Sequence, residues 1–169
     1  MISEKMQNAF NEQINKEFYS EFLYLAMKSY FSNLNLQGFV NWFDVQVQEE
    51  RAHAFGMYDY VLERGGNVEL YTIDKPEIEG NDIIPIFEQV LKHEQYVTSR
   101  INYLADVADE VKDRAAMSFI DWYIKEQVEE EASVEKILKT LRLIQGDKKA
   151  LLMLDKDLAA RVFNPPVIG

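Results

Sequence analysis

The sequence predicts an all-α fold, a four-helix bundle followed by one short helix. Only 7 of the 169 residues are Gly and 4 are Pro, and between them run long stretches in which apolar residues recur at steps of three and four. Hydrophobic residues make up 47% and charged residues 28% of the chain, the balance of a folded globular protein. We expect one domain over residues 1–169, with the bundle at about 4–144.

The first two helices are predicted at about 4–31 and 37–64. Ser3 is a favourable N-cap for the first, which contains neither Gly nor Pro. The second ends at Gly65-Gly66, a strong stop signal. Because the joint between them is short, the two helices should form an antiparallel hairpin.

An extended connection is predicted at 67–81, where Pro and Gly interrupt the helical pattern. A third helix should follow from about Asp82 to Asp109 and a fourth from about Lys112 to Ile144. These two are again joined by a short turn and form a second hairpin. The long connection can run the length of the bundle, so helices two and three can be parallel, which is a bundle with one crossover.

A short amphipathic fifth helix is predicted at about 148–162, before the tail Asn164-Pro165-Pro166. Its apolar face needs a surface on which to pack. That face carries Leu151, Leu152, Leu154 and Leu158.

Composition excludes several classes of function. The absence of cysteine excludes disulfides and thiolate metal sites. The net charge of −11 argues against nucleic-acid binding and is compatible with attracting cations. No stretch of about 18 apolar residues is present to cross a membrane, and the N-terminus lacks the pattern of a secretory signal, so we expect a cytoplasmic protein.

A carboxylate interrupts the apolar inward stripe of each long helix near its middle. Helix middles meet at the same level whether neighbours run parallel or antiparallel, so these side chains should converge. They are Glu17, Glu50, Glu94 and Glu130, with His53 one turn from Glu50. Helical phase alone does not separate Glu130 from Glu131; we choose Glu130 because Gln127-x-x-Glu130 repeats the spacing of Glu50-x-x-His53.

Converging carboxylates predict a metal site. An unpaired buried carboxylate costs several kcal/mol, roughly, and the inward stripes contain no Lys or Arg to offset it. Carboxylate oxygens with one imidazole suit iron, manganese or zinc. Tyr24, two turns from Glu17, is either a partner of a ligand carboxylate or an ordinary core tyrosine. We interpret Trp122 as packing and His93, which lies off the stripe, as a surface residue.

Four motifs around these residues resemble those of the prokaryotic non-haem ferritins, and the resemblance extends along essentially the whole chain. The motifs are Asn15-Lys16-Glu17-Phe18-Tyr19-Ser20, Gln48-Glu49-Glu50-Arg51-Ala52-His53-Ala54, His93-Glu94 and Trp122-Tyr123-Ile124-Lys125-Glu126-Gln127-Val128-Glu129-Glu130-Glu131.

The resemblance implies a ferritin-like bundle with an internal di-iron ferroxidase centre, in a hollow cage of twenty-four copies. Glu17, Glu50 and His53 would hold the first iron, and Glu50 would bridge to the second. Glu94 and Glu130 would complete the second position, with Gln127 close by. A third iron position would be formed by Glu49, Glu126, Glu129 and Glu130, although a solvated acidic face remains an alternative for Glu126, Glu129 and Glu131.

The expected function is iron storage, in which Fe(II) is oxidised by O2 or peroxide and Fe(III) mineral is kept in the cage. Haem is not expected, because Gln127-x-x-Glu130 replaces a second Glu-x-x-His and Arg51 occupies the place of the haem-binding methionine of bacterioferritins. Two alternatives remain open: a di-metal oxygen-activating oxidoreductase acting on an organic substrate, and a structural assembly without catalysis.

Overall fold

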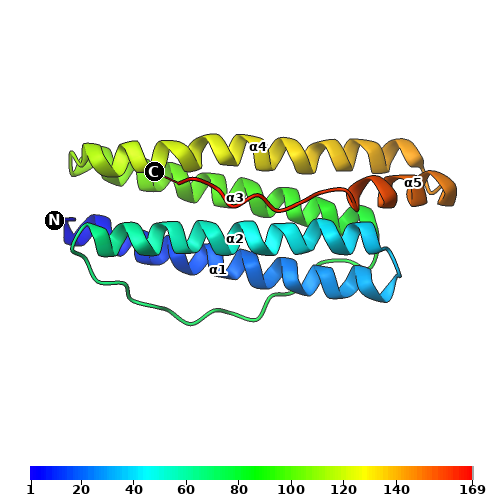
Figure 1. The fold of residues 1–169 in the computed structure, drawn as a ribbon, viewed down its shortest axis with the longest axis horizontal. Coiled ribbons are helices and arrows are strands. Elements are labelled where there is room, and N and C mark those ends of the chain that lie inside the picture. Colours follow the sequence, from blue (N-terminus) through cyan, green and yellow to red (C-terminus); the bar gives the residue numbers. More distant parts are fainter. Residues whose placement is uncertain (169) are drawn as a thin grey trace.

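The computed structural model describes residues 1–168, and it confirms the all-α prediction. Four long helices form the bundle and a short fifth helix lies at one end of it (Figure 1). Their bounds are α1 (Glu4–Asn33), α2 (Gln37–Glu63), α3 (Ile83–Glu110), α4 (Arg114–Ile144) and α5 (Lys148–Leu158). A search of the described helices finds none with the length and hydropathy of a membrane span.

The topology is the predicted bundle with one crossover. Helices α1 and α2 form one antiparallel hairpin, and α3 and α4 form the other (Figure 1). The segment 64–82 runs along the outside of the bundle from the end of α2 to the start of α3, so these two helices are parallel. Backbones of α1 and α3 also lie close together, whereas α2 and α4 reach each other through long side chains.

Local signals set the helix ends as expected. The hydroxyl of Ser3 accepts a hydrogen bond from Met6 N at 3.3 Å, and the carboxylate of Asp82 accepts one from Ile83 N at 2.7 Å. Gly65, at φ 72°, takes the left-handed conformation just after α2, in which glycine is least strained.

The predicted end of the fifth helix at residue 162 is wrong, because α5 ends at Leu158. The physical reason is a competing set of hydrogen bonds. The Asn41 side chain of α2 donates to the carbonyls of Leu158 at 3.2 Å and Arg161 at 2.9 Å, which holds the chain extended against α2. The tail then runs back between α2 and α4 (Figure 1).

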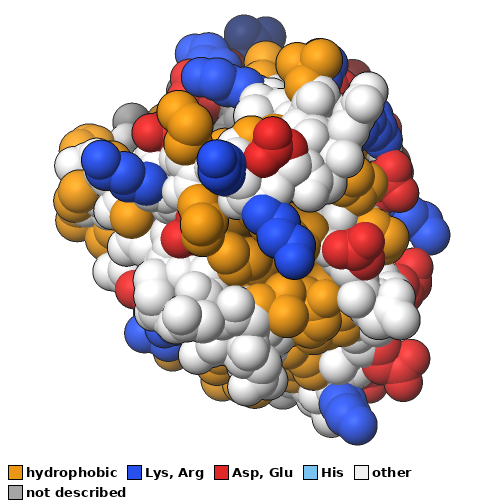
Figure 2. Space-filling view, turned by 90° about the vertical axis from the view of Figure 1, so that its right-hand side faces the viewer, with side chains coloured by type: hydrophobic (Ala, Val, Ile, Leu, Met, Phe, Trp, Pro, Cys, Tyr) orange, Lys and Arg blue, Asp and Glu red, His pale blue; other side chains and the backbone are white. Residues whose placement is uncertain are grey.

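Helix α5 packs on the end of its own bundle. Asp155 Oδ1 accepts hydrogen bonds from the backbone N–H groups of Gly38 at 2.8 Å and Phe39 at 3.0 Å, and so caps α2, whose N-cap residue Leu36 makes no side-chain cap. A Cβ at Gly38 would lie 1.5 Å from the Asp155 carbonyl oxygen, so this close approach requires glycine. Hydrophobic side chains gather at this end among charged ones (Figure 2). The apolar face that packs there includes Leu151, Leu154 and Leu158.

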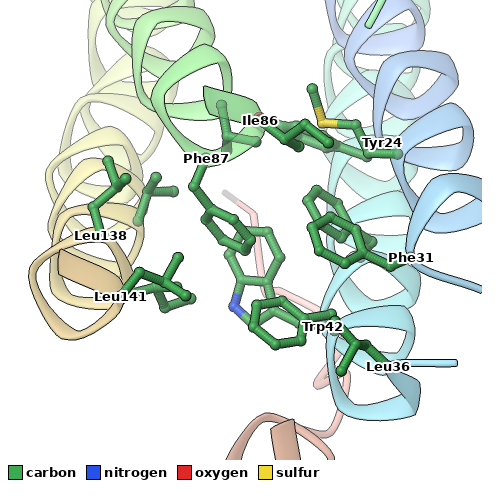
Figure 3. Close-up of a cluster of buried hydrophobic side chains, with 14 of the residues drawn as sticks. Tyr24, Phe31, Leu36, Trp42, Ile86, Phe87, Leu138 and Leu141 are labelled. Carbon is green, nitrogen blue, oxygen red and sulfur yellow. The ribbon is translucent and has the colours of Figure 1, made fainter. Parts of the chain in front are cut away.

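The buried apolar side chains form two clusters, one toward each end of the bundle. The cluster nearer α5 is rich in aromatic rings (Figure 3). It includes Tyr24, Phe31, Trp42, Phe87 and Leu138, and the other cluster includes Phe10, Met57, Ile101, Phe119 and Tyr123. On every long helix the residues between these two clusters include a buried carboxylate.

Candidate metal centre

A band of buried polar side chains separates the two apolar clusters. Its carboxylates and imidazole are at most 4% exposed, so these are core residues. They are Glu17, Glu50, His53, Glu94 and Glu130. Within residues 1–168 no Lys or Arg is buried, so this band has no fully buried cationic side chain.

Three members of the band lie close enough to share one ion. Glu17, Glu50 and His53 each offer a ligand atom, and these atoms all lie within 4.8 Å of one another. His53 Nδ1 is 3.6 Å from Glu50 Oε2. Glu17 Oε2, Glu50 Oε2 and His53 Nε2 are buried without a hydrogen-bond partner in the described part of the chain. Buried polar atoms are rarely left unpaired, and this donor set suits a hard or intermediate divalent cation.

A second group shares His53 with the first. One ligand atom each of His53, Glu126 and Glu130 lies within the same 4.8 Å limit, with His53 Nε2 at 3.9 Å from Glu126 Oε1. Glu130 Oε2 accepts a hydrogen bond from Gln46 Nε2 at 3.0 Å. Glu131 is half-buried and accepts a 2.5 Å hydrogen bond from Thr98, which leaves Glu130 as the residue that faces the band.

Glu94 is held by hydrogen bonds and belongs to neither of these groups. Its Oε1 accepts a hydrogen bond from the Tyr24 hydroxyl, and its Oε2 accepts one from Gln127 Nε2 at 3.2 Å. Gln13 similarly donates to Glu17 Oε1 at 2.7 Å. A glutamine amide therefore steadies each of the three carboxylates of Glu17, Glu94 and Glu130.

The band is electrostatically unfavourable without a cation. Burial raises the pKa of Glu94 to about 8, and the charge of Glu130 adds to the effect. Burial also raises the pKa of Glu50 well above its usual range, helped by the charges of Glu94 and Glu17. A cation between these carboxylates would offset both the burial and the mutual repulsion.

Comparison with known proteins places this geometry in a family. The family model described as the ferritin-like domain matches residues 7–144. The chain belongs to the ferritin family. It is 39% identical to a bacterial non-heme ferritin of Staphylococcus saprophyticus and 37% identical to one of Staphylococcus aureus strain USA300, each over 97% of this chain and 98% or more of the relative.

Solved structures of a ferritin from Archaeoglobus fulgidus are also similar. A closed form engineered by site-directed mutagenesis is 51% identical, with a TM-score of 0.95 over 97% of this chain and all of that one. A structure described as a novel open pore ferritin is 52% identical, with a TM-score of 0.93 over 95% of this chain and 98% of that one.

The other predicted residues of this ferritin differ in their surroundings. Glu49 is half-buried and forms an ion pair with Arg161 at 2.6 Å, and burial raises its pKa to about 7 although Arg161 acts in the opposite direction. Glu129 is exposed, and its carboxylate is in neither group. Trp122 packs edge-on against the His53 ring at 5.6 Å, which agrees with a packing role.

The interpretation of His93 as a surface residue is wrong. Its side chain is half-buried, and its Nε2 lies 2.8 Å from the Ser20 hydroxyl. Its ring also packs edge-on against Tyr24. Burial lowers the pKa of His93 to about 4. The close approach of α1 and α3 covers a helix face that the phase of α3 alone assigns to solvent.

Sequence reasoning missed three side chains that contact the band. Gln13 and Gln46 lie one helical turn before Glu17 and Glu50, so a search for amides at that spacing would have found them. Arg161 has no such signal, because it lies beyond α5 and reaches the band only through the path of the tail.

Proposed function

We propose that this chain stores iron in a hollow assembly of its own copies and oxidises Fe(II) on the way in. Fe(II) is the substrate, and O2 or peroxide is the oxidant. The observation that carries the proposal is the buried trio Glu17, Glu50 and His53, which can share one ion and each of which has a buried polar atom without a hydrogen-bond partner in the described part of the chain. The family and its relatives named bacterial non-heme ferritin support iron as the metal.

Each ligand residue of the band has a proposed role in binding iron. Glu17, Glu50 and His53 bind the first Fe(II), and Glu50 also faces the second position. Glu94 and Glu130 complete the second position, with Gln127 and Tyr24 holding the Glu94 carboxylate. A third position toward storage uses Glu49, Glu126, Glu129 and Glu130. Of these, Glu126 and Glu130 already share a close group with His53.

The chemistry follows from two ions held side by side. Two Fe(II) ions together give up two electrons, which reduce O2 to the level of peroxide or reduce peroxide to water. Carboxylates favour Fe(III), the harder ion, and so favour oxidation. The protein supplies spacing, ligands and an apolar surrounding, while the redox chemistry belongs to iron. The Fe(III) product then leaves for the interior and is stored as mineral.

Assembly is part of the proposal. We expect a closed assembly of twenty-four copies. The solved relatives support a shell, because one is described as an open pore ferritin and another as an engineered closed form of the ferritin from the same organism. The cytoplasmic location, the absence of haem and the single-domain assignment stay predictions.

The proposal is tested by changing the shared ligand. Glu50→Ala should abolish rapid Fe(II) oxidation because both positions lose a ligand, whereas Glu130→Ala should mainly weaken the second position. Glu131→Ala is the matched control, since that carboxylate bonds Thr98 instead. The measurement is the stopped-flow rate of Fe(III) formation in air by purified assemblies. A native rate for Glu50→Ala would show that the assignment is wrong.

The rival di-metal oxygenase function needs a substrate cavity beside the ligands. Five of the surface hollows formed by residues 1–168, of about 250 to 560 Å³, lie elsewhere, and none of these five is lined by the ligand residues of the first two positions. The other alternative is a structural assembly without catalysis. It predicts that replacing Glu94 leaves the rate of iron oxidation unchanged.

A further inference from the structure

Arg161 enters the acidic side of the band from the tail beyond α5. Its Nη2 lies 2.6 Å from Glu49 Oε2, and its Nη1 donates to Gln46 Oε1. The guanidinium carbon lies 5.1 Å from the ring centroid of Trp42. Trp42, Gln46 and Glu49 follow at helical spacing on α2, so one face of that helix forms a cradle for this single cation.

The backbone fixes Arg161 in this cradle. Asn41 Nδ2 donates to the Arg161 carbonyl at 2.9 Å and to the Leu158 carbonyl at 3.2 Å, and Arg161 Nη1 also reaches the Trp42 carbonyl at 3.5 Å. Only 25% of the Arg161 side chain is exposed, and 18% of the Glu49 side chain. Because both partners are largely shielded and the tail is anchored, this pair differs from a freely solvated surface ion pair.

One amide links Arg161 to the buried carboxylates. Gln46 is fully buried, accepts from Arg161 through its Oε1, and donates through its Nε2 to Glu130 Oε2 at 3.0 Å. The guanidinium therefore contacts Glu49 directly and Glu130 through Gln46. Glu130 lies in the close group with His53 and Glu126, so the network ends at atoms positioned to bind a cation.

We propose that Arg161 is the resident counter-cation of the third iron position and that an incoming cation displaces its guanidinium from Glu49. This inference rests on the proposed function, because it deepens the role given there to Glu49 and Glu130. Arginine stays charged at any ordinary pH, so it cannot yield its place by losing a proton. Its guanidinium must move away from Glu49, and the tail then loses the contacts with α2 that the guanidinium makes.

The arrangement has a consequence for the passage of iron. A cation bound by Glu49, Glu126 and Glu130 competes with a positive charge that is part of the chain. That competition weakens the third position relative to the first two, so an ion there is released more readily toward storage. When the cation has left, Arg161 returns and again offsets the charge of Glu49.

The test measures Zn(II), which has no redox chemistry, binding to metal-free assembled protein by calorimetry. We compare native protein with Arg161→Gln, Arg161→Lys and Glu49→Gln. Arg142→Gln is the charge-matched control, because Arg142 pairs with Glu88 at 2.7 Å on the exposed surface. The native protein should bind two Zn(II) tightly and a third weakly. Arg161→Gln should bind the third about tenfold more tightly, since a competing charge is removed.

The other variants separate charge from positioning. Arg161→Lys keeps the charge and should bind the third ion as weakly as native protein, Glu49→Gln should lose it, and Arg142→Gln should match native protein. A third-ion affinity that is unchanged or lowered in Arg161→Gln would overturn the proposal. A lowered affinity would mean that Arg161 orients Glu49 as a ligand instead of competing for it.

Native protein offers a second measurement that needs no variant. Hydrogen exchange at the amides of Ala159, Ala160 and Arg161, which bond carbonyls of α5, should accelerate when the third Zn(II) binds, because the contacts that hold these turns against α2 are loosened. Unchanged exchange at saturation would overturn displacement. If native protein bound no Zn(II) tightly, the proposed function itself would fail. If two Zn(II) bound tightly and the affinity for the third did not change in Arg161→Gln, only this inference would be overturned.

Discussion

Replacing Glu94 by glutamine tests the cost of the buried carboxylates directly. Gln removes the charge, keeps the size and keeps an oxygen that accepts from the Tyr24 hydroxyl. Glu94→Leu also removes the charge, but it leaves the Tyr24 hydroxyl without its partner, while the Gln127 amide keeps the carbonyl of residue 94 and the Thr98 hydroxyl. Such a buried group costs about 1 to 3 kcal/mol, so Gln is the cleaner variant and Leu the comparison.

The magnitude follows from the pKa of Glu94 in the metal-free protein. Burial and Glu130 raise it from 4.5 to about 8. A carboxyl whose folded pKa is raised contributes its full stability below pH 4.5 and loses it as pH rises through about 8. At roughly 1.4 kcal/mol per pKa unit, the loss over that interval is on the order of 4 to 5 kcal/mol. Glu94→Gln should therefore be more stable than native protein at pH 8, and the difference should shrink toward pH 5.

Metal acts in the opposite direction and stabilises native protein more than the variant. A cation that binds only the folded state adds about 2.7 kcal/mol per site at a free concentration a hundred times its dissociation constant. Native protein should gain from both of its proposed positions, whereas Glu94→Gln should keep only the gain of the Glu17, Glu50 and His53 position. The native protein is then the more strongly stabilised of the two by Zn(II).

The assay is chemical denaturation of native, Gln and Leu proteins at pH 5 and pH 8, each with and without Zn(II). Protein concentration is held constant, because dissociation of the assembly and unfolding are linked. Metal-free Glu94→Gln that is markedly less stable than native protein at pH 8 would refute the reasoning, since Glu94 would then be a structural partner. An equal Zn(II)-dependent gain in both proteins would refute its role as a ligand.

Two further predictions concern α5. Asp155→Ala removes the acceptor for the N–H groups of Gly38 and Phe39 and should lower the free energy of unfolding by about 1 kcal/mol in chemical denaturation. Asp157→Ala, an exposed neighbour, is the control and should have little effect. Ending the chain after Gln145 should yield loose or leaky assemblies by size exclusion and iron-retention assays; intact, iron-retaining assemblies would exclude a role for α5 in closure.

The bundle and its polar band could be predicted because both depend on local periodicity. Apolar spacing of three and four identified all four long helices, and the carboxylate that interrupted each stripe was buried as expected. The seam of α3, for example, has Glu94 at 0% exposure between Val90 and Val97. A long helix in a bundle turns one face toward the core, so the position of a residue in the helical repeat nearly determines whether its side chain is buried.

Features that depend on the path of the chain after a helix could not be predicted in this way. The periodicity of the last helix extends to 162, but the amide of Asn41, more than a hundred residues away, ends it at Leu158. The burial of His93 depends on how closely α1 approaches α3. Arg161 combines both difficulties, because neither its extended backbone nor its partners lie in its own segment.

The two apolar clusters explain how a fold with a repulsive centre can exist before metal arrives. Stacked aromatic rings lie at both ends. The ring centroids of Phe31 and Phe39 are 5.0 Å apart at one end, and those of Tyr60 and Phe119 are 3.9 Å apart at the other. The middle of each long helix lies between two packed regions, so carboxylate repulsion there cannot separate the helices without opening an end. Glutamine amides further fix three of the carboxylates by hydrogen bonds. The packed ends therefore stabilise the bundle independently of its charged middle. The buried carboxylates lower the free energy of unfolding until a bound cation offsets their repulsion.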